Sequence, residues 1–129
     1  EGVKAAFNNI LNNLKYGEEY LVFTLGEEHL RKDVKRFFDN YHLKRVEKGI
    51  NVRLISPEGI KGVLLKRYKY TGLKVKFSRL KLPTGIFIYG DNVMTVVWGE
   101  RPTAFVITSK NNALRYKGFF EEVWEGAKN

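Results

Sequence analysis

The feature of this sequence best suited to bind another molecule is a window of eight cationic side chains without one carboxylate. No Asp or Glu occurs between Gly59 and Gly90. The cations of the window are Lys61, Lys66, Arg67, Lys69, Lys74, Lys76, Arg79 and Lys81. Such cations repel one another unless they are spread apart or hold an anion, and the nearby Tyr68 and Tyr70 are able to stack on a base or a sugar. The window therefore predicts an anion-binding surface. The alternative is a solvated loop and an edge strand that lysines protect from pairing.

The two histidines are the other candidates for chemistry. His29 lies among Glu27, Glu28 and Asp33, a setting in which it would act as a general base or a weak metal ligand. The alternative for His29 is a surface position near the start of a helix. His42 lies late in a helix, and we assign it a structural role. With no cysteine and two histidines, we expect no metal and no cofactor. Neither a phosphate-binding P-loop nor a Gly-x-Ser-x-Gly nucleophile motif occurs.

Length and composition limit the classes of protein to which the chain can belong. Its 129 residues, of which 43% are hydrophobic, suffice for one domain with its own core. The net charge of +9 favours anionic partners, nucleic acid among them. No apolar run approaches the roughly 20 residues of a membrane helix, and the absence of cysteine fits a reducing, cytoplasmic compartment. Because the chain begins with Glu1 rather than Met, we expect a piece of a longer protein.

Apolar periodicity predicts the elements that hold these residues. Helical stripes are expected over 3–14, 30–46 and 113–127, with a shorter helix over 60–70. Strand patterns are expected over 20–25, 50–55, 73–77, 86–89, 93–98 and 104–107. Residues 109–112 supply helix-capping side chains.

The order of these elements predicts a mixed sheet. Strand, helix and strand over 20–55 form a βαβ unit, whose two strands are parallel. Such a sheet places ligands at the carboxyl ends of its strands, here the loops 25–29 and 56–59. The turn signal Gly90-Asp91-Asn92 joins the next two strands into a hairpin. We therefore expect an α/β fold with a mixed, partly parallel central sheet and helices on both faces, as one domain over 1–129.

The long helix followed by the strand over 49–55, together with the later hairpin, resembles the phospholipase D-like fold. The catalytic motif of that family is His-x-Lys followed four residues later by Asp, on a hairpin of this kind. Placing its Asp on Asp91 puts Thr84 where the family has its histidine and Ile86 where it has its lysine. The resemblance therefore implies a catalytically degenerate domain that is not an enzyme.

Four short segments of the second half resemble the regulatory half of archaeal TrmB-like transcription regulators. They are Arg79–Pro83, the sequence IYGDNV at 88–93, Arg101–Ala104 and Phe119–Ala127. The resemblance implies a DNA-binding winged helix upstream of this chain, and a domain here that senses an effector, forms a homodimer, or does both. In such a regulator, a ligand that prefers one arrangement of the dimer would change the spacing of the DNA-binding parts.

We expect the effector, a small anion or a sugar, to bind around Arg79, Lys81, Thr84 and Asp91, with Arg79 and Lys81 holding an anionic group. The alternative is direct nucleic-acid binding. Its candidate residues are Lys61, Lys66, Arg67, Lys69, Lys74 and Lys76. A residual phosphodiesterase that uses His29 with Glu27 or Glu28 is the less favoured alternative.

Overall fold

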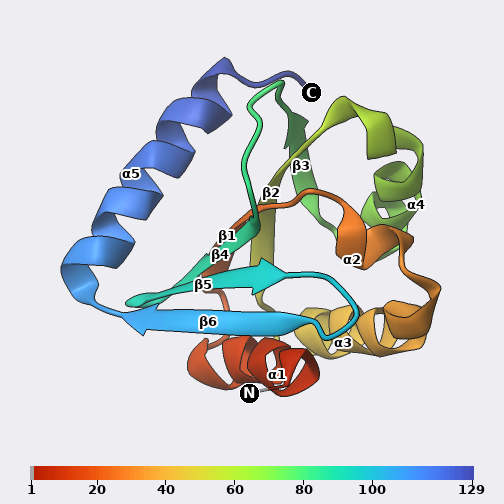
Figure 1. Ribbon diagram of the computed structural model, residues 1–129, viewed down its shortest axis with the longest axis horizontal. Helices are drawn as coiled ribbons and strands as arrows, with labels where there is room; N and C mark the ends of the chain where they lie inside the picture. The colour runs from red at the N-terminus through yellow and green to blue at the C-terminus, as the bar shows by residue number, and fades with distance from the viewer. Residues whose placement is uncertain (1) are drawn as a thin grey trace.

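One six-stranded mixed sheet forms the centre of the protein (Figure 1). The computed structural model describes residues 2–129, except for the side chains of residues 67–70. The strands are β1 (Glu19–Phe23), β2 (Asn51–Ser56), β3 (Lys74–Phe77), β4 (Gly85–Tyr89), β5 (Asn92–Val97) and β6 (Thr103–Thr108). The helices are α1 (Val3–Asn13), α2 (Glu27–Leu30), α3 (Lys35–Glu47), α4 (Lys61–Thr71) and α5 (Lys110–Gly126), with 3-10 turns at Lys32–Val34 and Glu58–Ile60.

The sheet has a parallel half and an antiparallel half. Its order is β3-β2-β1-β4-β5-β6. β1, β2 and β3 run parallel, with Val22 beside Leu54 and Leu54 beside Val75. β4, β5 and β6 form an antiparallel meander, which joins β1 through the pair Val22 and Phe87. The expected α/β class and the parallel βαβ unit are thereby confirmed.

Helices cover both faces of the sheet, and each face has its own apolar core. On the first face, α1, α3 and α4 pack on the sheet, and the Phe7 ring meets Phe38, Tyr41 and Phe87 edge-on at centroid distances of 4.8, 5.6 and 4.9 Å. On the other face α5 packs alone, with Phe120 fully buried and 5.2 Å from Phe23. Burial on both faces explains the continuous apolar run of β1.

The hairpin β4–β5 and the N-terminus of α5 agree with the sequence pattern. Gly90 adopts φ +57° in the turn, a conformation that costs glycine little. Asn92, expected in the turn, instead opens β5 and pairs with Tyr89. Ser109 caps α5, because its side chain accepts a hydrogen bond from the backbone N–H of Asn112 at 3.2 Å.

The long helix expected over 30–46 is broken into α2, a 3-10 turn and α3. Arg31 is extended at the break, with ψ 123°. Its guanidinium donates to both carboxylate oxygens of Asp33 at 3.0 and 2.8 Å and to the carbonyl of Gly99 at 2.8 Å. The local ion pair with Asp33 and the tertiary bond to Gly99 favour a bend over the helical period.

Candidate anion-binding site at the strand ends

A pocket of about 480 Å³ lies where the three parallel strands end. It is lined by Leu25 after β1, by Pro57 and Glu58 after β2, and by residues 78–82 after β3. Parallel strands bring their carboxyl ends to one edge of the sheet, and ligand sites of open α/β sheets form there. The two loops that the sequence placed at this edge, 25–29 and 56–59, both contribute to the pocket. Figure 1 shows the chain after β3 rising beside the C-terminus.

Backbone hydrogen bonds fix the base of the 78–82 loop. The N–H of Ser78 donates to the carbonyl of Ser56 at 3.0 Å, and the N–H of Leu80 donates to the Ser78 hydroxyl at 3.1 Å. Phe77 and Lys128 exchange two backbone bonds, of 2.6 and 2.9 Å. The loop is thus anchored at the end of β3 and continues into β4, while the side chains of Arg79 and Lys81 are exposed to solvent.

Cationic charge predominates in this pocket. Arg79 and Lys81 are exposed, and Glu58 is the single acidic residue of the described lining. Within the described part of the chain, no ion pair joins Arg79 or Lys81 to a carboxylate. Guanidinium and ammonium groups are the usual partners of carboxylate and phosphate oxygens, and Leu80 and Leu82 offer an apolar wall. The pocket is suited to a small anion that carries an apolar part.

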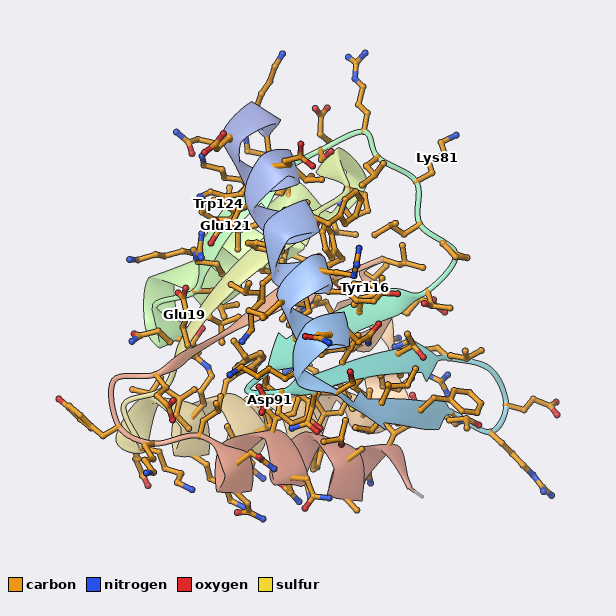
Figure 2. The ribbon with its side chains drawn as sticks, turned by 90° about the vertical axis from the view of Figure 1, so that its left-hand side faces the viewer. Glu19, Lys81, Asp91, Tyr116, Glu121 and Trp124 are labelled. Atoms are coloured by element: carbon orange, nitrogen blue, oxygen red, sulfur yellow. The ribbon has the colours of Figure 1, made fainter. Side chains whose placement is uncertain are left out.

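The structure does not bring Asp91 to the other three predicted effector residues. Thr84 lies directly before β4, whereas Asp91 lies in the turn after it, at the opposite end of the strand. A strand of five residues spans roughly 17 Å. Figure 2 shows Lys81 and Asp91 at opposite ends of the sheet. The carbonyl of Asp91 instead accepts the N–H of Ser109 at 2.9 Å, so Asp91 belongs to the start of α5.

The cations predicted to bind nucleic acid lie on both faces of the sheet. The Lys76 ammonium donates to the carbonyl of Trp124 at 3.1 Å and lies 4.8 Å from the Trp124 ring, on the face that α5 covers. The Lys61 ammonium lies 5.3 Å from the ring of Phe77, which packs in the opposite core. Lys66 and Lys74 are exposed, and the side chains of Arg67 and Lys69 lie outside the described residues. The window is therefore not one continuous patch.

Both histidines line a second pocket, of about 390 Å³, bounded by α2, α3 and α4. His29 is not a surface residue, because its side chain is 4% exposed, with Nε2 3.4 Å from Oε1 of the buried Glu28. Glu28 also accepts a hydrogen bond from the Thr24 hydroxyl. His42 Nδ1 accepts a hydrogen bond from Arg45 Nε at 3.3 Å. Among the described residues, no cluster of three or more His, Asp or Glu side chains is able to hold a metal ion.

Sequence reasoning missed the role of Arg45. It reads as part of the polar face of α3, yet it is 2% exposed. Its guanidinium donates to the carbonyl of Ile50, which precedes β2, at 2.8 Å and to the carbonyl of Thr71, at the end of α4, at 2.5 Å. Burial lowers the pKa of Arg45. No signal in the helical pattern distinguishes this cation from its exposed neighbours, because its partners are distant backbone carbonyls.

Comparisons with known proteins give structural similarity without a matching family. No protein-family model matches the chain, and no curated protein sequence matches it. In the described residues, no helix has the length and apolar character needed to cross a membrane. Among solved structures, the chain is similar to TrmBL2, described as an archaeal chromatin protein with a novel mode of DNA binding. The TM-score is 0.64 at 15% identity, over 98% of this chain and 51% of that one. This chain thus spans about half the length of TrmBL2, and the likeness shows that the two share a fold.

Proposed function

We propose that this chain is the non-catalytic, effector-sensing and dimerising domain of a regulator that binds DNA through a separate upstream domain. The observation that carries the proposal is the fold that this chain shares with half of TrmBL2, a DNA-binding chromatin protein. Two properties of this chain support the same proposal: the net charge of +9 and the cationic pocket at the strand ends.

The effector of this proposal is a small anion, such as a sugar phosphate, bound at the strand-end pocket by Arg79 and Lys81. Both cations belong to the loop that connects the parallel half of the sheet to β4. A ligand that neutralises them would favour the loop conformation in which they lie close together. Such a ligand shifts a regulator only through its different affinities for the two states of the protein.

The absence of catalysis is part of the same proposal. In the phospholipase D-like alignment, Thr84 and Ile86 occupy the positions of the nucleophilic histidine and the phosphate-holding lysine. Ile86 is 7% exposed and packs in the core below α5, where it offers no group for transfer. A phosphodiesterase based on His29 with Glu27 or Glu28 is the less favoured function, and its activity would disappear in His29→Ala.

Thermal unfolding in the presence of phosphate, sulfate, sugar phosphates and nucleotides tests the effector site. A ligand that binds only the folded chain raises its Tm with a saturable dependence on concentration. We expect this rise in the wild type, its loss in the Arg79→Ala, Lys81→Ala double variant, and its retention in Arg36→Ala, Lys44→Ala, which removes two exposed cations from α3. Equal responses of the two double variants would refute the site, as would the lack of stabilisation by any of these anions.

Direct nucleic-acid binding is the second candidate, favoured by the exposure of Lys66 and Lys74. Retention of this chain on DNA would then weaken with salt, with a log–log slope of about −0.9 for each phosphate neutralised. Lys66→Ala and Lys74→Ala would each reduce the slope, whereas Lys15→Ala, an exposed lysine after α1, would not. A chain that passes through the DNA column at low salt excludes this candidate and leaves the effector site untouched.

A further inference from the structure

The outer strand β6 presents large apolar side chains to solvent. Phe105, Val106 and Ile107 are 57%, 42% and 59% exposed, although each belongs to a regular strand, Thr103–Thr108, at the outer edge of the antiparallel half. β6 ends the sheet order, so on its outer side the described residues supply no neighbouring strand. On that side an isolated bridge joins Gly2 to Thr103, the first residue of the strand, and α1 lies next to β6. The edge from Ala104 to Thr108 therefore offers unpaired N–H and C=O groups.

The strand register shows where these side chains point. Phe105 pairs with Thr95 and Ile107 with Val93, and Val93 packs in the core below α5. Phe105 and Ile107 therefore lie on the face that α5 covers, whereas Val106, beside Met94, lies on the other face. α5 crosses the sheet and leaves β6 uncovered at its flank (Figure 2). The exposed apolar surface thus continues around both sides of the edge.

The other edge of the sheet is closed. β3 carries Lys74 and Lys76, and charged side chains on an edge oppose pairing. In addition, Phe77 forms an antiparallel bridge to Lys128, with two backbone hydrogen bonds. A β3-to-β6 contact between copies would make an open, head-to-tail assembly, and this closed edge prevents it. Only β6 remains for strand pairing, so association through the sheet must be symmetric.

The charge distribution favours a second copy of this chain as the partner. Two copies of a protein with a net charge of +9 repel each other across most of their surfaces. No charged residue occurs from Pro102 to Ser109, so contact along β6 brings no like charges into the strand pair. An antiparallel pair of identical edges also satisfies the N–H and C=O groups of both strands by the same two-fold operation.

We propose that the protein dimerises by antiparallel pairing of β6 with β6 of a second copy, which joins the two sheets into one. Phe105 and Ile107 of each copy then cover those of the other on the α5 side, and Val106 does so on the opposite side. This inference rests on the homodimer of the proposed function and specifies its surface. It does not depend on the effector pocket, which lies at the ends of β1, β2 and β3.

Sedimentation equilibrium of the wild type and two charge variants tests this interface. We expect a wild-type dimer, and Ile107→Glu should weaken it at least about tenfold, as expected for a central apolar contact. The matched control is Leu43→Glu on α3, because Leu43 is also 59% exposed. Its dimer should dissociate as the wild type does. Unchanged thermal stability of the monomeric form would show that Ile107→Glu still folds.

Single cysteines provide a second test, which is free of background because the chain has no native cysteine. Directly opposed residues of antiparallel strands have Cβ atoms about 4.5–5.5 Å apart, close to the separation that a disulfide bridges. We expect at least one of Phe105→Cys, Val106→Cys and Ile107→Cys to give a covalent dimer on mild oxidation, and Leu43→Cys to give none.

The outcomes separate this inference from the proposed function. If the wild type is a dimer that Ile107→Glu does not weaken and that no cysteine variant cross-links, the interface lies elsewhere. This result would refute β6 pairing and leave the homodimer intact. A wild-type monomer at the highest soluble concentration would refute both. A dimer lost in Ile107→Glu, with the anion-induced rise in Tm retained, would support the interface independently of the effector site.

Discussion

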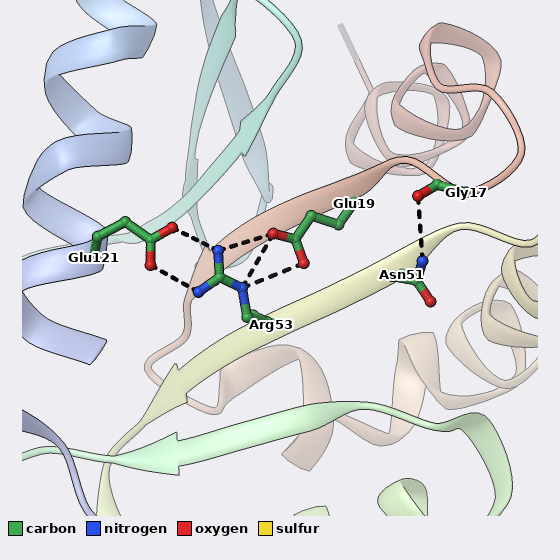
Figure 3. Close-up of polar contacts among 5 residues, drawn as sticks. All are labelled: Gly17, Glu19, Asn51, Arg53 and Glu121. Atoms are coloured by element: carbon green, nitrogen blue, oxygen red, sulfur yellow. Dashed lines mark hydrogen bonds and ion pairs between the residues drawn. The ribbon is translucent and has the colours of Figure 1, made fainter. Parts of the chain in front are cut away.

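Arg53 on β2 and Glu121 on α5 form a two-point ion pair that fastens the last helix to the sheet. Nη1 of Arg53 donates to Oε1 of Glu121 at 2.7 Å, and Nη2 donates to Oε2 at 2.6 Å (Figure 3). Glu19 on β1 accepts from Nε and Nη2 of the same guanidinium at 3.1 and 2.8 Å. The cation also lies 5.4 and 5.3 Å from the rings of Phe120 and Trp124. One side chain thus connects two strands and a helix.

The Arg53→Lys variant should therefore lower the free energy of unfolding, although it preserves the charge. An ammonium cannot make the paired bonds of a guanidinium or stack on two rings in the same way. Because the carboxylates are partly exposed, the expected loss is about 1 kcal/mol, measured by urea unfolding. Arg36→Lys on the exposed face of α3 is the control. A loss no greater than that of the control would show that Arg53 acts as a charge alone.

The same pair makes stability depend on acidity. The Arg53 hydrogen bonds hold the pKa of Glu121 below its usual value. A carboxyl with a lowered folded-state pKa stabilises the fold above its unfolded pKa, near 4.3, and the stabilisation is lost as pH falls through the lower folded value. Glu121→Gln should reduce the pH dependence of the free energy of unfolding, measured by urea unfolding over this pH range. The expected reduction is a few tenths of a kcal/mol, because the carboxylate is half exposed. An unchanged slope in the variant would contradict the assignment.

Alkaline pH should destabilise the protein through Tyr20 and Tyr41, whose buried hydroxyls lie 2.9 Å apart. Burial raises the pKa of Tyr20 to about 12 and also raises that of Tyr41. A raised folded-state pKa means that the stabilisation is complete below pH 10 and decreases as pH rises toward 12. The loss attributable to Tyr20 is at most about 1.4 kcal/mol per pH unit in that window, and the raised pKa of Tyr41 acts in the same direction. Tyr20→Phe should reduce this slope, whereas Tyr16→Phe, at an exposed position, should not.

Substitution of the buried Arg45 should be among the most damaging single changes. Arg45→Met keeps the aliphatic volume but removes the donor to the buried carbonyl of Ile50 and one hydrogen bond to the carbonyl of Thr71. An unsatisfied buried acceptor costs about 1–3 kcal/mol, so the expected loss is about 2–4 kcal/mol. Lys44→Met, at the exposed neighbouring position of α3, should be nearly neutral. Similar urea midpoints for the two variants would contradict the anchoring role of Arg45.

Two glycines with positive φ should respond differently to alanine. A Cβ at Gly26 (φ +92°) would lie 2.7 Å from Cδ1 of the buried Ile60, whereas a Cβ at Gly49 (φ +70°) would meet the ring of the exposed Tyr16. Both variants carry the cost of a left-handed residue, about 1 kcal/mol, but Tyr16 is free to rotate into solvent. Gly26→Ala should therefore lower Tm more than Gly49→Ala, and the reverse order would disprove this reasoning.

Sequence periodicity was enough to identify the six strands and most of the helices, but not the break between α2 and α3. The apolar stripe of α1 and the alternation of Val75 and Phe77 against Lys74 and Lys76 both describe the observed cores. The βαβ rule also located the loops that line the strand-end pocket. These predictions rest on the backbone geometry of single elements and of one crossover, which a sequence pattern encodes directly.

The remaining features depend on tertiary partners that no local pattern contains. The run Ala104–Ile107 has the composition of a buried strand, and nothing in it shows that β6 is an edge. The spacing of the phospholipase D-like motif placed Asp91 in the effector site together with Thr84. That spacing does not show that Thr84 and Asp91 lie at opposite ends of β4. A surface position was one of the two expectations for His29, whereas its side chain is 4% exposed and lines the second pocket.

The sheet order has a consequence for how the chain folds. β4, β5, β6 and α5 follow one another and pair with their immediate neighbours, so their contacts close short loops at little entropic cost. β1 lies between β2 and β4, and its pairing with β4 closes a loop that contains nearly half of the chain, residues 24–85. Long-range pairings of this kind slow folding. β1 therefore acquires its second partner only after β4 has been synthesised, and until then the central strand of the native sheet remains open on one side.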